Sequence, residues 1–314
     1  MPYKTACFYC LSAIQAQSDE AFGYGLHKEC YLKWFSLKEL EEFSSIARRS
    51  NSNKKTGAAL PKESWGASFF IGKFKKYSAM LASESYILKV KDDEAPELPE
   101  LEYLCNQIAK ETDIPNPDFY FLHFSNVGTF VTKNFVRKGA NVDLTHIHHY
   151  LPGGASEYNC ESIIKVILEH TKRLTNAETF IKTCLFDVLV GNGDRHSRNL
   201  GFLVTPRGIE LSPIYDNASN LGLEQGEILK SDWNPTGKIA TKDSTEPGCI
   251  EYVEDFFRLG YGDVVAKWFA SVSLPKIKGL ITKSFCGELM KQAMDRLVSK
   301  RYQEMASAIK KRSQ

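Results

Sequence analysis

The sequence has no long apolar run, no secretory signal and no excess of charge of one sign. No stretch approaches the roughly 20 apolar residues that a membrane-spanning helix needs, and the polar N-terminus lacks the basic segment and apolar run of a signal peptide. Lys and Arg number 40 against 38 Asp and Glu, for a net charge of +2. The basic residues form only short clusters, whereas a nucleic-acid surface would concentrate them. We therefore expect a protein that contacts neither a membrane nor nucleic acid directly.

Internal repeats and low-complexity segments are also lacking. The chain has 314 residues, of which 43% are hydrophobic and 25% charged, which is ordinary for globular proteins. At roughly 100–200 residues per domain, this length predicts two units with their own cores and a small appendage. Eight cysteines are present, and five of them are scattered through apolar or mixed segments, as free thiols are in a reducing compartment. We therefore expect a cytoplasmic location.

The first part of the chain is expected to be rich in strands. Apolar residues at three- and four-residue steps predict a helix over residues 29–49. Branched and aromatic residues then predict short strands, with one amphipathic helix among them at residues 98–110. The expected strands cover residues 67–74, 77–82, 85–90, 118–124 and 129–135.

Beyond residue 137 helical periodicity dominates around one short strand pair. The expected elements are helices at 144–151, 163–172 and 178–190, strands at 200–204 and 209–212, and further helices beyond 248. Strands followed by helices indicate an α+β fold with two lobes. The boundaries we expect are 1–50 for an N-terminal segment, 51–135 for a β-rich N-lobe and 136–314 for a helical C-lobe.

The most informative motif is Gly193-Asp194-Arg195-His196-Ser197-Arg198-Asn199, followed by the strand pair and then by Ile214-Tyr215-Asp216. Phosphoryl transfer needs a carboxylate that orients the attacking hydroxyl, and oxygen ligands for Mg²⁺. An Asp, an Asn five residues later and an Asp after the next hairpin form the protein-kinase arrangement. The alternative is an ordinary polar loop, because Asp, Asn and Gly are common turn formers.

A kinase also needs a lysine on a strand and a carboxylate that holds it. Lys89 interrupts an apolar strand, and Glu102 lies in the expected helix 98–110, next to its apolar stripe. Because a buried lysine is costly unless it is paired, we predict an ion pair between the two that places the ammonium beside the ATP phosphates. The alternative is that Lys89 faces solvent on an edge strand. Upstream, the small residues Gly57, Ala58 and Ala59 could cradle phosphates through backbone N–H groups.

Together these residues resemble the HipA-like kinases, which are bacterial Ser/Thr kinase toxins, and the chain is most similar to the short HipT type. The similarity spans roughly residues 55–300. Its anchors are Gly57 to Lys62, Tyr86-Ile87-Leu88-Lys89, Pro99-Glu100-Leu101-Glu102-Tyr103, the Asp194 motif and Ile214-Tyr215-Asp216. The Asp-x-His-x-x-Asn order is the most specific of these, because ordinary kinases place the His before the Asp.

The resemblance implies a protein-kinase-like fold, ATP and Mg²⁺. It implies that Lys89 contacts phosphates, that Asp194 is the catalytic base and that His196 lies near the phosphates. It also implies that Asn199 and Asp216 are the Mg²⁺ ligands. A hinge at Lys133-Asn134-Phe135 would meet adenine through its backbone.

The resemblance further implies a toxin that is held by antitoxin proteins, one of them DNA-binding, and that phosphorylates an aminoacyl-tRNA synthetase. The sequence departs from the family where the phosphate loop usually carries an autophosphorylated serine. The nearest hydroxyl groups here are those of Thr56 and, further upstream, Ser52 and Ser50. These three residues are our candidates for autophosphorylation.

The N-terminal segment carries a pattern that the kinase reading does not explain. Cys7-x2-Cys10 and His27-x2-Cys30 could surround one structural Zn²⁺, replacing a core that 30 residues cannot build. The alternative is free thiols at a mobile terminus. A second group, His146, His148 and His149, we interpret as the polar surface of a helix rather than a metal site.

Two other functions remain open. A small-molecule phosphotransferase, such as an antibiotic kinase, has a similar Asp-x4-Asn loop followed by an Asp. A pseudokinase or a zinc-bearing interaction module would keep the fold without the reaction. Lys89, Asp194, Asn199 and Asp216 are all present, which favours an active protein kinase.

Overall fold

The computed structural model describes residues 6–14, 21–49, 76–91, 93–124, 126–136, 141–151, 153–232 and 235–312. Packing divides the chain into a first unit, Met1–Tyr103 with Asp118–Phe135, and a second unit, Leu104–Pro117 with Val136–Gln314. Helix α3 (Leu98–Glu111) begins in the first unit and ends in the second. Among the described residues, no helix combines the length and the apolar character needed to cross a membrane.

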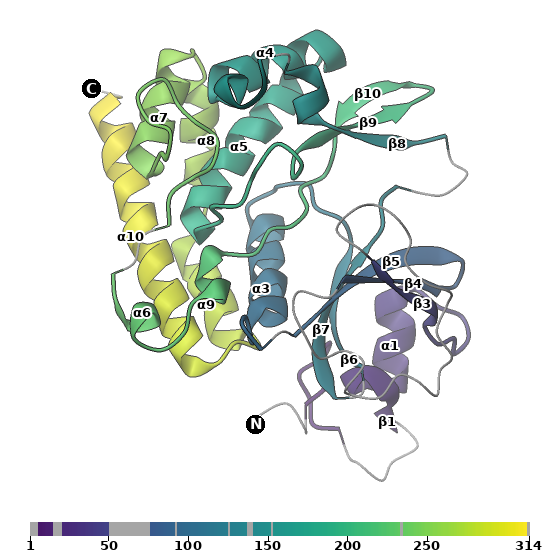
Figure 1. Ribbon diagram of the computed structural model, residues 1–314. Coiled ribbons are helices and arrows are strands. Elements are labelled where there is room, and N and C mark those ends of the chain that lie inside the picture. The colour runs from purple at the N-terminus through teal and green to yellow at the C-terminus, as the bar shows by residue number, and fades with distance from the viewer. Residues whose placement is uncertain are drawn as a thin grey trace. The chain divides into compact units, whose positions relative to one another are not determined.

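A five-stranded antiparallel sheet is the centre of the first unit (Figure 1). Its strand order is β3-β4-β5-β7-β6. The strands are β3 (Ser44–Arg49), β4 (Lys76–Leu81), β5 (Glu84–Val90), β6 (Phe119–Phe124) and β7 (Val127–Lys133). Alternate residues of β4 and β5 are buried, as expected for strands with one face on a core.

One helix, α1 (Lys28–Phe35), packs on this sheet through aromatic side chains. The Phe35 ring stacks on Tyr120 of β6 with 4.1 Å between ring centroids, and it meets Tyr86 of β5 edge-on. Before α1 lie the short elements β1 (Ala21–Phe22), η2 (Gly23–Gly25) and β2 (Leu26–His27). The N-terminal segment is therefore packed against the sheet through α1.

The second unit is mostly helical and includes a three-stranded sheet of order β10-β9-β8. The strands are β8 (Asp143–His146), β9 (Gly201–Thr205) and β10 (Gly208–Leu211). The α-helices are α4 (Cys160–Thr171), α5 (Leu174–Val190), α6 (Glu227–Lys230), α7 (Cys249–Arg258), α8 (Gly262–Ser271), α9 (Leu274–Lys283) and α10 (Glu288–Arg312). Short 3-10 turns are η4 (Ile147–Tyr150), η5 (Gly154–Glu157) and η6 (Asn220–Leu223).

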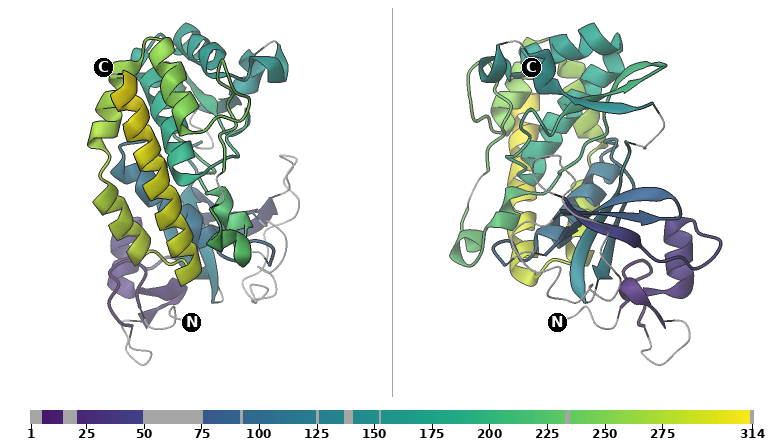
Figure 2. Two further views of the ribbon diagram at one scale, coloured as in Figure 1. Left: turned by 90° about the vertical axis from the view of Figure 1, so that its left-hand side faces the viewer. Right: turned by 45° about the vertical axis from the view of Figure 1, so that its right-hand side comes forward.

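The long helix α10 runs beside α5, α7 and α9 (Figure 2). Eleven residues of α5 are buried, and from Thr183 to Val190 the burial extends all round the helix, as expected for a helix inside a core. This central position matters because the Asp194 motif follows α5 directly.

Most of the expected elements are present within one to four residues at each end. Helix 98–110 is α3, and the expected strands 77–82, 85–90, 118–124 and 129–135 correspond to β4, β5, β6 and β7. Helices 163–172 and 178–190 correspond to α4 and α5, and the strand pair to β9 and β10. The expected strand at 67–74 lies outside the described residues.

The helix predicted over residues 29–49 is wrong in its second half. Helix α1 ends at Phe35 because Ser36 adopts a left-handed conformation (φ 54°) and its N–H bonds back to Leu32 and Lys33. The chain then continues into β3, which pairs with β4. Buried apolar residues such as Phe43 and Ile46 fitted the helical spacing by coincidence.

The helix predicted over residues 144–151 is also wrong. Residues 143–146 form β8, which pairs with β9 in the register Thr145 to Phe202, and one 3-10 turn follows. A partner strand more than 50 residues away satisfies the backbone of this segment. Thus His146 ends a strand and His148 and His149 lie in a turn, so the three do not form one helical surface.

Candidate active site

The loop that carries Asp194 and Asn199 begins at a fixed point, the end of α5. Gly191 caps this helix with a positive φ of 73°, and its N–H bonds to the Asp187 carbonyl. A Cβ atom at this position would lie 2.7 Å from Leu297 of α10. Only glycine meets both demands, so the loop leaves the helix at one defined angle.

Local hydrogen bonds then hold the loop. The N–H of His196 donates to the Asp194 carbonyl at 2.7 Å, and the N–H of Asn199 donates to the His196 carbonyl at 2.8 Å. The Nδ2 atom of Asn199 also donates to the Asp194 carbonyl, at 2.9 Å. That bond leaves Oδ1 as the atom of Asn199 that can coordinate a cation. Asn199 is buried, whereas Asp194 is exposed.

A buried ion pair between Arg195 and Asp187 of α5 lies behind this loop. The guanidinium donates from Nε to Oδ2 at 2.9 Å and from Nη2 to Oδ1 at 2.8 Å. Their side chains are only 1% and 4% exposed. Burial raises the pKa of the Asp187 carboxyl, and the Arg195 charge and the amide of Asn192 oppose that shift. A two-pronged pair of this kind fixes orientation as well as charge.

The same guanidinium reaches the two segments that carry the predicted metal ligands. Arg195 Nη1 donates to the Asn199 carbonyl at 3.2 Å and to the Tyr215 carbonyl at 2.6 Å. Its Nη2 also donates to Oδ1 of Asn217 at 2.8 Å. Asp216, which adopts a left-handed conformation (φ 54°), lies between these last two contacts. Arg195 therefore fastens the Asp194 loop (residues 191–199) and the Asp216 segment (residues 215–217) to each other.

Three asparagines extend this network. Asn192 donates to Asp187 at 3.0 Å, and its Oδ1 accepts the N–H of Asp194 at 3.0 Å. Asn217 donates to Oδ1 of Asn106, in the second-unit part of α3, at 2.9 Å. A fully satisfied buried polar network is rigid and specifies one arrangement, so the backbone on both sides of Asp194 and Asp216 is held in place.

Sequence reasoning missed this network. Asp187 stands in the otherwise apolar run Cys184 to Val190, and a carboxylate within a buried helix needs a partner. The free-energy cost of burying the Asp187 carboxylate indicates that an arginine or lysine lies near it. The sequence could not show that the partner is Arg195, because several basic residues were equally available.

The predicted ion pair between Lys89 of β5 and Glu102 of α3 is present in the first unit. The two side chains are 14% and 3% exposed, and Lys89 Nζ also lies 5.7 Å from the centre of the Phe130 ring. The alternative of a solvent-facing lysine on an edge strand is excluded, since β5 lies between β4 and β7.

Three other nucleotide-site candidates, Lys133, Asn134 and Phe135, lie at or directly after the end of β7. Lys133 ends β7, and its ammonium lies 3.1 Å from Glu84. The N–H of Asn134 donates to the Ser85 carbonyl at 2.8 Å. Phe135 is the last residue of the first unit, and its side chain is half-buried. The candidates Gly57, Ala58, Ala59, Ser50, Ser52 and Thr56 lie outside the described residues.

His196 bonds to the backbone of its own loop, and the four candidate zinc ligands lie close together. Nδ1 of His196 accepts the N–H of Arg198 at 3.1 Å. The ligand atoms of the four predicted zinc ligands all lie within 4.8 Å of one another. These four residues are Cys7, Cys10, His27 and Cys30.

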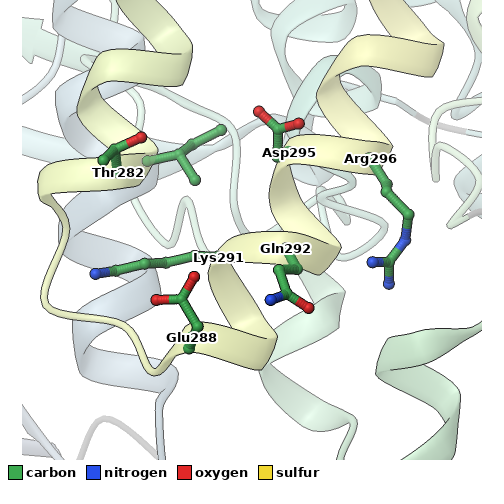
Figure 3. A pocket seen from close by; sticks show the side chains of 7 residues that line it. Thr282, Glu288, Lys291, Gln292, Asp295 and Arg296 are labelled. Carbon is green, nitrogen blue, oxygen red and sulfur yellow. The ribbon is translucent and has the colours of Figure 1, made fainter.

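A pocket on the second unit lies between α9 and α10 (Figure 3), and no motif residue is among those that line it. Its lining is mostly polar and charged, and Asp295 at its wall pairs with Lys278 at 3.0 Å. Its labelled residues are Thr282, Glu288, Lys291, Gln292, Asp295 and Arg296. Because no predicted site residue lines it, it is not the candidate active site.

These features define a protein-kinase-like fold, and comparisons with solved structures agree. The kinase CtkA of Helicobacter pylori matches with a TM-score of 0.64 and 16% identity over 76% of this chain and 94% of that chain. HipA of Shewanella oneidensis, solved with HipB and operator DNA, matches with a TM-score of 0.51 and 14% identity. That match covers 72% of this chain and 59% of HipA. At such identities the likeness concerns the fold alone.

The sequence itself defines the family. The model of the HipA-like C-terminal domain matches residues 65–255, which is more than half of the chain. The protein therefore belongs to the HipA-like kinase family. A search of curated proteins found no match.

Proposed function

We propose that the protein is an ATP- and Mg²⁺-dependent Ser/Thr protein kinase. The observation that carries this proposal is the convergence of the Asp194 loop and the Asp216 segment on the buried Arg195. Rigid placement of charged groups is the main contribution that a protein makes to phosphoryl transfer. Membership of the HipA-like family supports the same reaction class.

Each proposed role agrees with the position of its residue. The exposed carboxylate of Asp194 is accessible to a substrate hydroxyl, which it would orient and deprotonate as general base. Asn199 and Asp216 offer an amide oxygen and a carboxylate, and such oxygen donors fit Mg²⁺. When bound with ATP, Mg²⁺ would offset the negative charge of the phosphates.

The remaining residues would bind the nucleotide. Lys89, oriented by Glu102, would contact the phosphates, with His196 and the backbone of Gly57, Ala58 and Ala59 near them. The backbone from Lys133 to Phe135 would meet adenine. These assignments rest on the family motif.

We further propose that this kinase is the cytoplasmic toxin of a bacterial toxin–antitoxin pair. HipA of S. oneidensis was solved together with HipB and operator DNA. An antitoxin protein is accordingly the expected partner here, and contact with DNA would be made by the partner. The substrate would be a protein of translation such as an aminoacyl-tRNA synthetase.

The first test separates ATP binding from transfer. Wild-type protein incubated with Mg²⁺, γ-labelled ATP and cell lysate should label a lysate protein, whereas Asp194→Ala should not. Calorimetry should show nearly unchanged ATP affinity in Asp194→Ala, because the base acts only as the hydroxyl attacks. Asp216→Ala should lose Mg²⁺-dependent ATP binding, because it removes a cation ligand.

The exposed Asp263→Ala on α8 is the matched control and should behave as the wild type. Equal loss of ATP affinity in Asp194→Ala and Asp216→Ala would contradict the division of roles. Label that appears only in small alcohols such as aminoglycosides would favour the small-molecule phosphotransferase instead. Absence of ATP binding by the wild type would favour the pseudokinase.

The second test concerns self-phosphorylation, which we propose for Ser52, Ser50 or Thr56. A phosphoryl group there adds about −1.5 to −2 charges next to the proposed phosphate loop, so ATP binding should weaken. Phosphopeptide mapping after incubation with Mg²⁺ and ATP should find the modification in the wild type but not in Asp194→Ala. If the active enzyme carries no phosphate between residues 50 and 56, the regulatory proposal is wrong and the kinase proposal stands.

A further inference from the structure

The first unit contains a cluster of cysteine and histidine side chains that the kinase reaction does not use. Cys7 and Cys10 lie on a tight hairpin in which Ala6 pairs with Ala13. Two bonds close it: the N–H of Cys7 donates to the Ser12 carbonyl, and the N–H of Leu11 donates to the Cys7 carbonyl, both at 2.8 Å. Leu11 takes the left-handed conformation (φ 61°) that such a turn requires. The hairpin therefore presents both thiols on one turn.

The other two side chains come from the start of α1. His27 ends β2 and precedes the helix, and Cys30 lies in its first turn. The two residues are three positions apart, so their side chains lie on one side of the start of the helix. The ligand atoms of all four residues lie within 4.8 Å of one another.

The distances inside the cluster fit a tetrahedral ion. Nδ1 of His27 lies 3.5 Å from the sulfur of Cys10 and 3.8 Å from the sulfur of Cys30. In a regular tetrahedron with Zn–S of about 2.3 Å and Zn–N of about 2.05 Å, a sulfur and a nitrogen are about 3.6 Å apart. The two pairs therefore already have the separation that a shared Zn²⁺ imposes.

The histidine is also in the state that a metal ligand needs. Its other ring nitrogen, Nε2, lies 3.2 Å from the carbonyl oxygen of Ala13. A carbonyl only accepts, so in the neutral imidazole Nε2 carries the proton and Nδ1 offers its lone pair to the cluster. Histidines that bind metals commonly donate their second N–H to a carbonyl in this way.

Aromatic side chains of the hairpin pack against the sheet and against α1 in the first unit. Phe8 lies edge-on to Phe121 of β6 with 5.0 Å between ring centroids, and Tyr9 contacts Trp34 of α1 at 5.4 Å. The N–H of Phe8 also donates to the Gly25 carbonyl at 3.1 Å. A Cβ atom at position 25 would lie 2.2 Å from the Phe8 ring, so glycine is required for this approach.

We propose that Cys7, Cys10, His27 and Cys30 bind one structural Zn²⁺ that fastens the 6–13 hairpin to α1 and, through Phe8, to edge strand β6. With four protein ligands the site is closed, so its role is structural rather than catalytic. Residues 6–36 are too few to form a core of their own, and a metal supplies the missing cohesion. This proposal does not depend on kinase activity.

Metal analysis tests the proposal directly. The full-length protein purified without chelators should carry about one Zn²⁺ per chain. Replacing a residue that hydrogen-bonds to a metal ligand typically lowers metal affinity roughly 10–100-fold. Cys10→Ser and Cys30→Ser each remove a ligand itself, so they should lower zinc affinity by more than that. Cys286→Ala, which removes a buried cysteine of the second unit, is the matched control and should keep its zinc.

If the serine variants fail to fold, two variants of His27 test the same zinc site. His27→Cys should retain zinc, because four cysteines also bind it tetrahedrally, whereas His27→Ala should lose it. Cobalt-reconstituted wild type should show the absorption of tetrahedral thiolate-bound Co²⁺, and Cys286→Ala should show the same spectrum. A zinc-free wild type, or zinc that survives both Cys10→Ser and His27→Ala, would overturn the proposal.

Discussion

Glu100 illustrates how burial controls the chemistry of a single residue. It lies in the first turn of α3 and is 5% exposed, and among the described residues its Oε2 atom has no hydrogen-bond partner. Burial raises the pKa of its carboxyl to about 7, and Lys91 only partly opposes that shift. Gly128 of β7 permits this packing, because a Cβ there would lie 2.8 Å from Oε1.

This shift predicts a pH-dependent stability. The pKa of Glu100 is about 4.3 in an unfolded chain and about 7 in the folded protein, so the folded state holds the proton more tightly. The stabilising contribution is therefore complete below about pH 4 and is lost as pH rises through 7. At about 1.4 kcal/mol per pKa unit, the loss by pH 8 is roughly 4 kcal/mol.

Glu100→Gln removes the titration, and the expected result is a free energy of unfolding that falls less between pH 5.5 and 8 than that of the wild type. Urea denaturation at both pH values measures it. The exposed Glu169→Gln on α4 provides the control for exchanging a carboxyl for an amide. Parallel pH profiles for Glu100→Gln and wild type would show that Glu100 does not hold a proton in the folded state.

At the scale of elements, the Asp187–Arg195 pair connects α5, the Asp194 loop and the Asp216 segment. Removing one partner leaves the other charge buried and unpaired, so Asp187→Asn or Arg195→Met should each cost about 3–5 kcal/mol of unfolding free energy. The double variant Asp187→Asn/Arg195→Met should cost less than the sum of the two single changes. Chemical denaturation of all three variants measures this coupling.

The surface pair Arg173–Glu210, which is more than half exposed, is the matched control. Arg173→Met should change stability by at most about 1 kcal/mol. Strictly additive losses at Asp187 and Arg195 would contradict the role of the pair as one structural unit. Folded variants of the pair should also transfer phosphate more slowly than Arg173→Met does, because both loops depend on Arg195 for their position.

The elements also show where sequence periodicity succeeds and fails. Helices α3, α4 and α5 were predicted because their apolar stripes or apolar runs are long enough to exclude a strand. Residues 44–49 and 144–146 were predicted as helix but lie in β3 and β8. Both are short strands whose partners, β4 and β9, lie far along the chain, and local spacing carries no information about a distant partner.

For the whole molecule, the division into a sheet-based unit and a helical unit follows from the order of the elements in the sequence. By packing, residues 104–117 belong to the helical unit although strands β6 and β7 follow them. The cause lies in contacts such as the bond from Trp268 Nε1 to the Thr112 carbonyl at 3.0 Å. A boundary inside a continuous helix has no signature in composition.

The fold class, the pairing of Lys89 with Glu102 and the grouping of Cys7, Cys10, His27 and Cys30 could all be predicted from the sequence. Each follows from local spacing or from the cost of burying one charge. Three contacts could be found only in the folded chain: Arg195 pairs with Asp187, Arg195 joins the Asp194 loop to the Asp216 segment, and Ala13 orients His27. These contacts join residues from separate segments, and packing alone determines which of several chemically suitable partners lies within hydrogen-bonding distance.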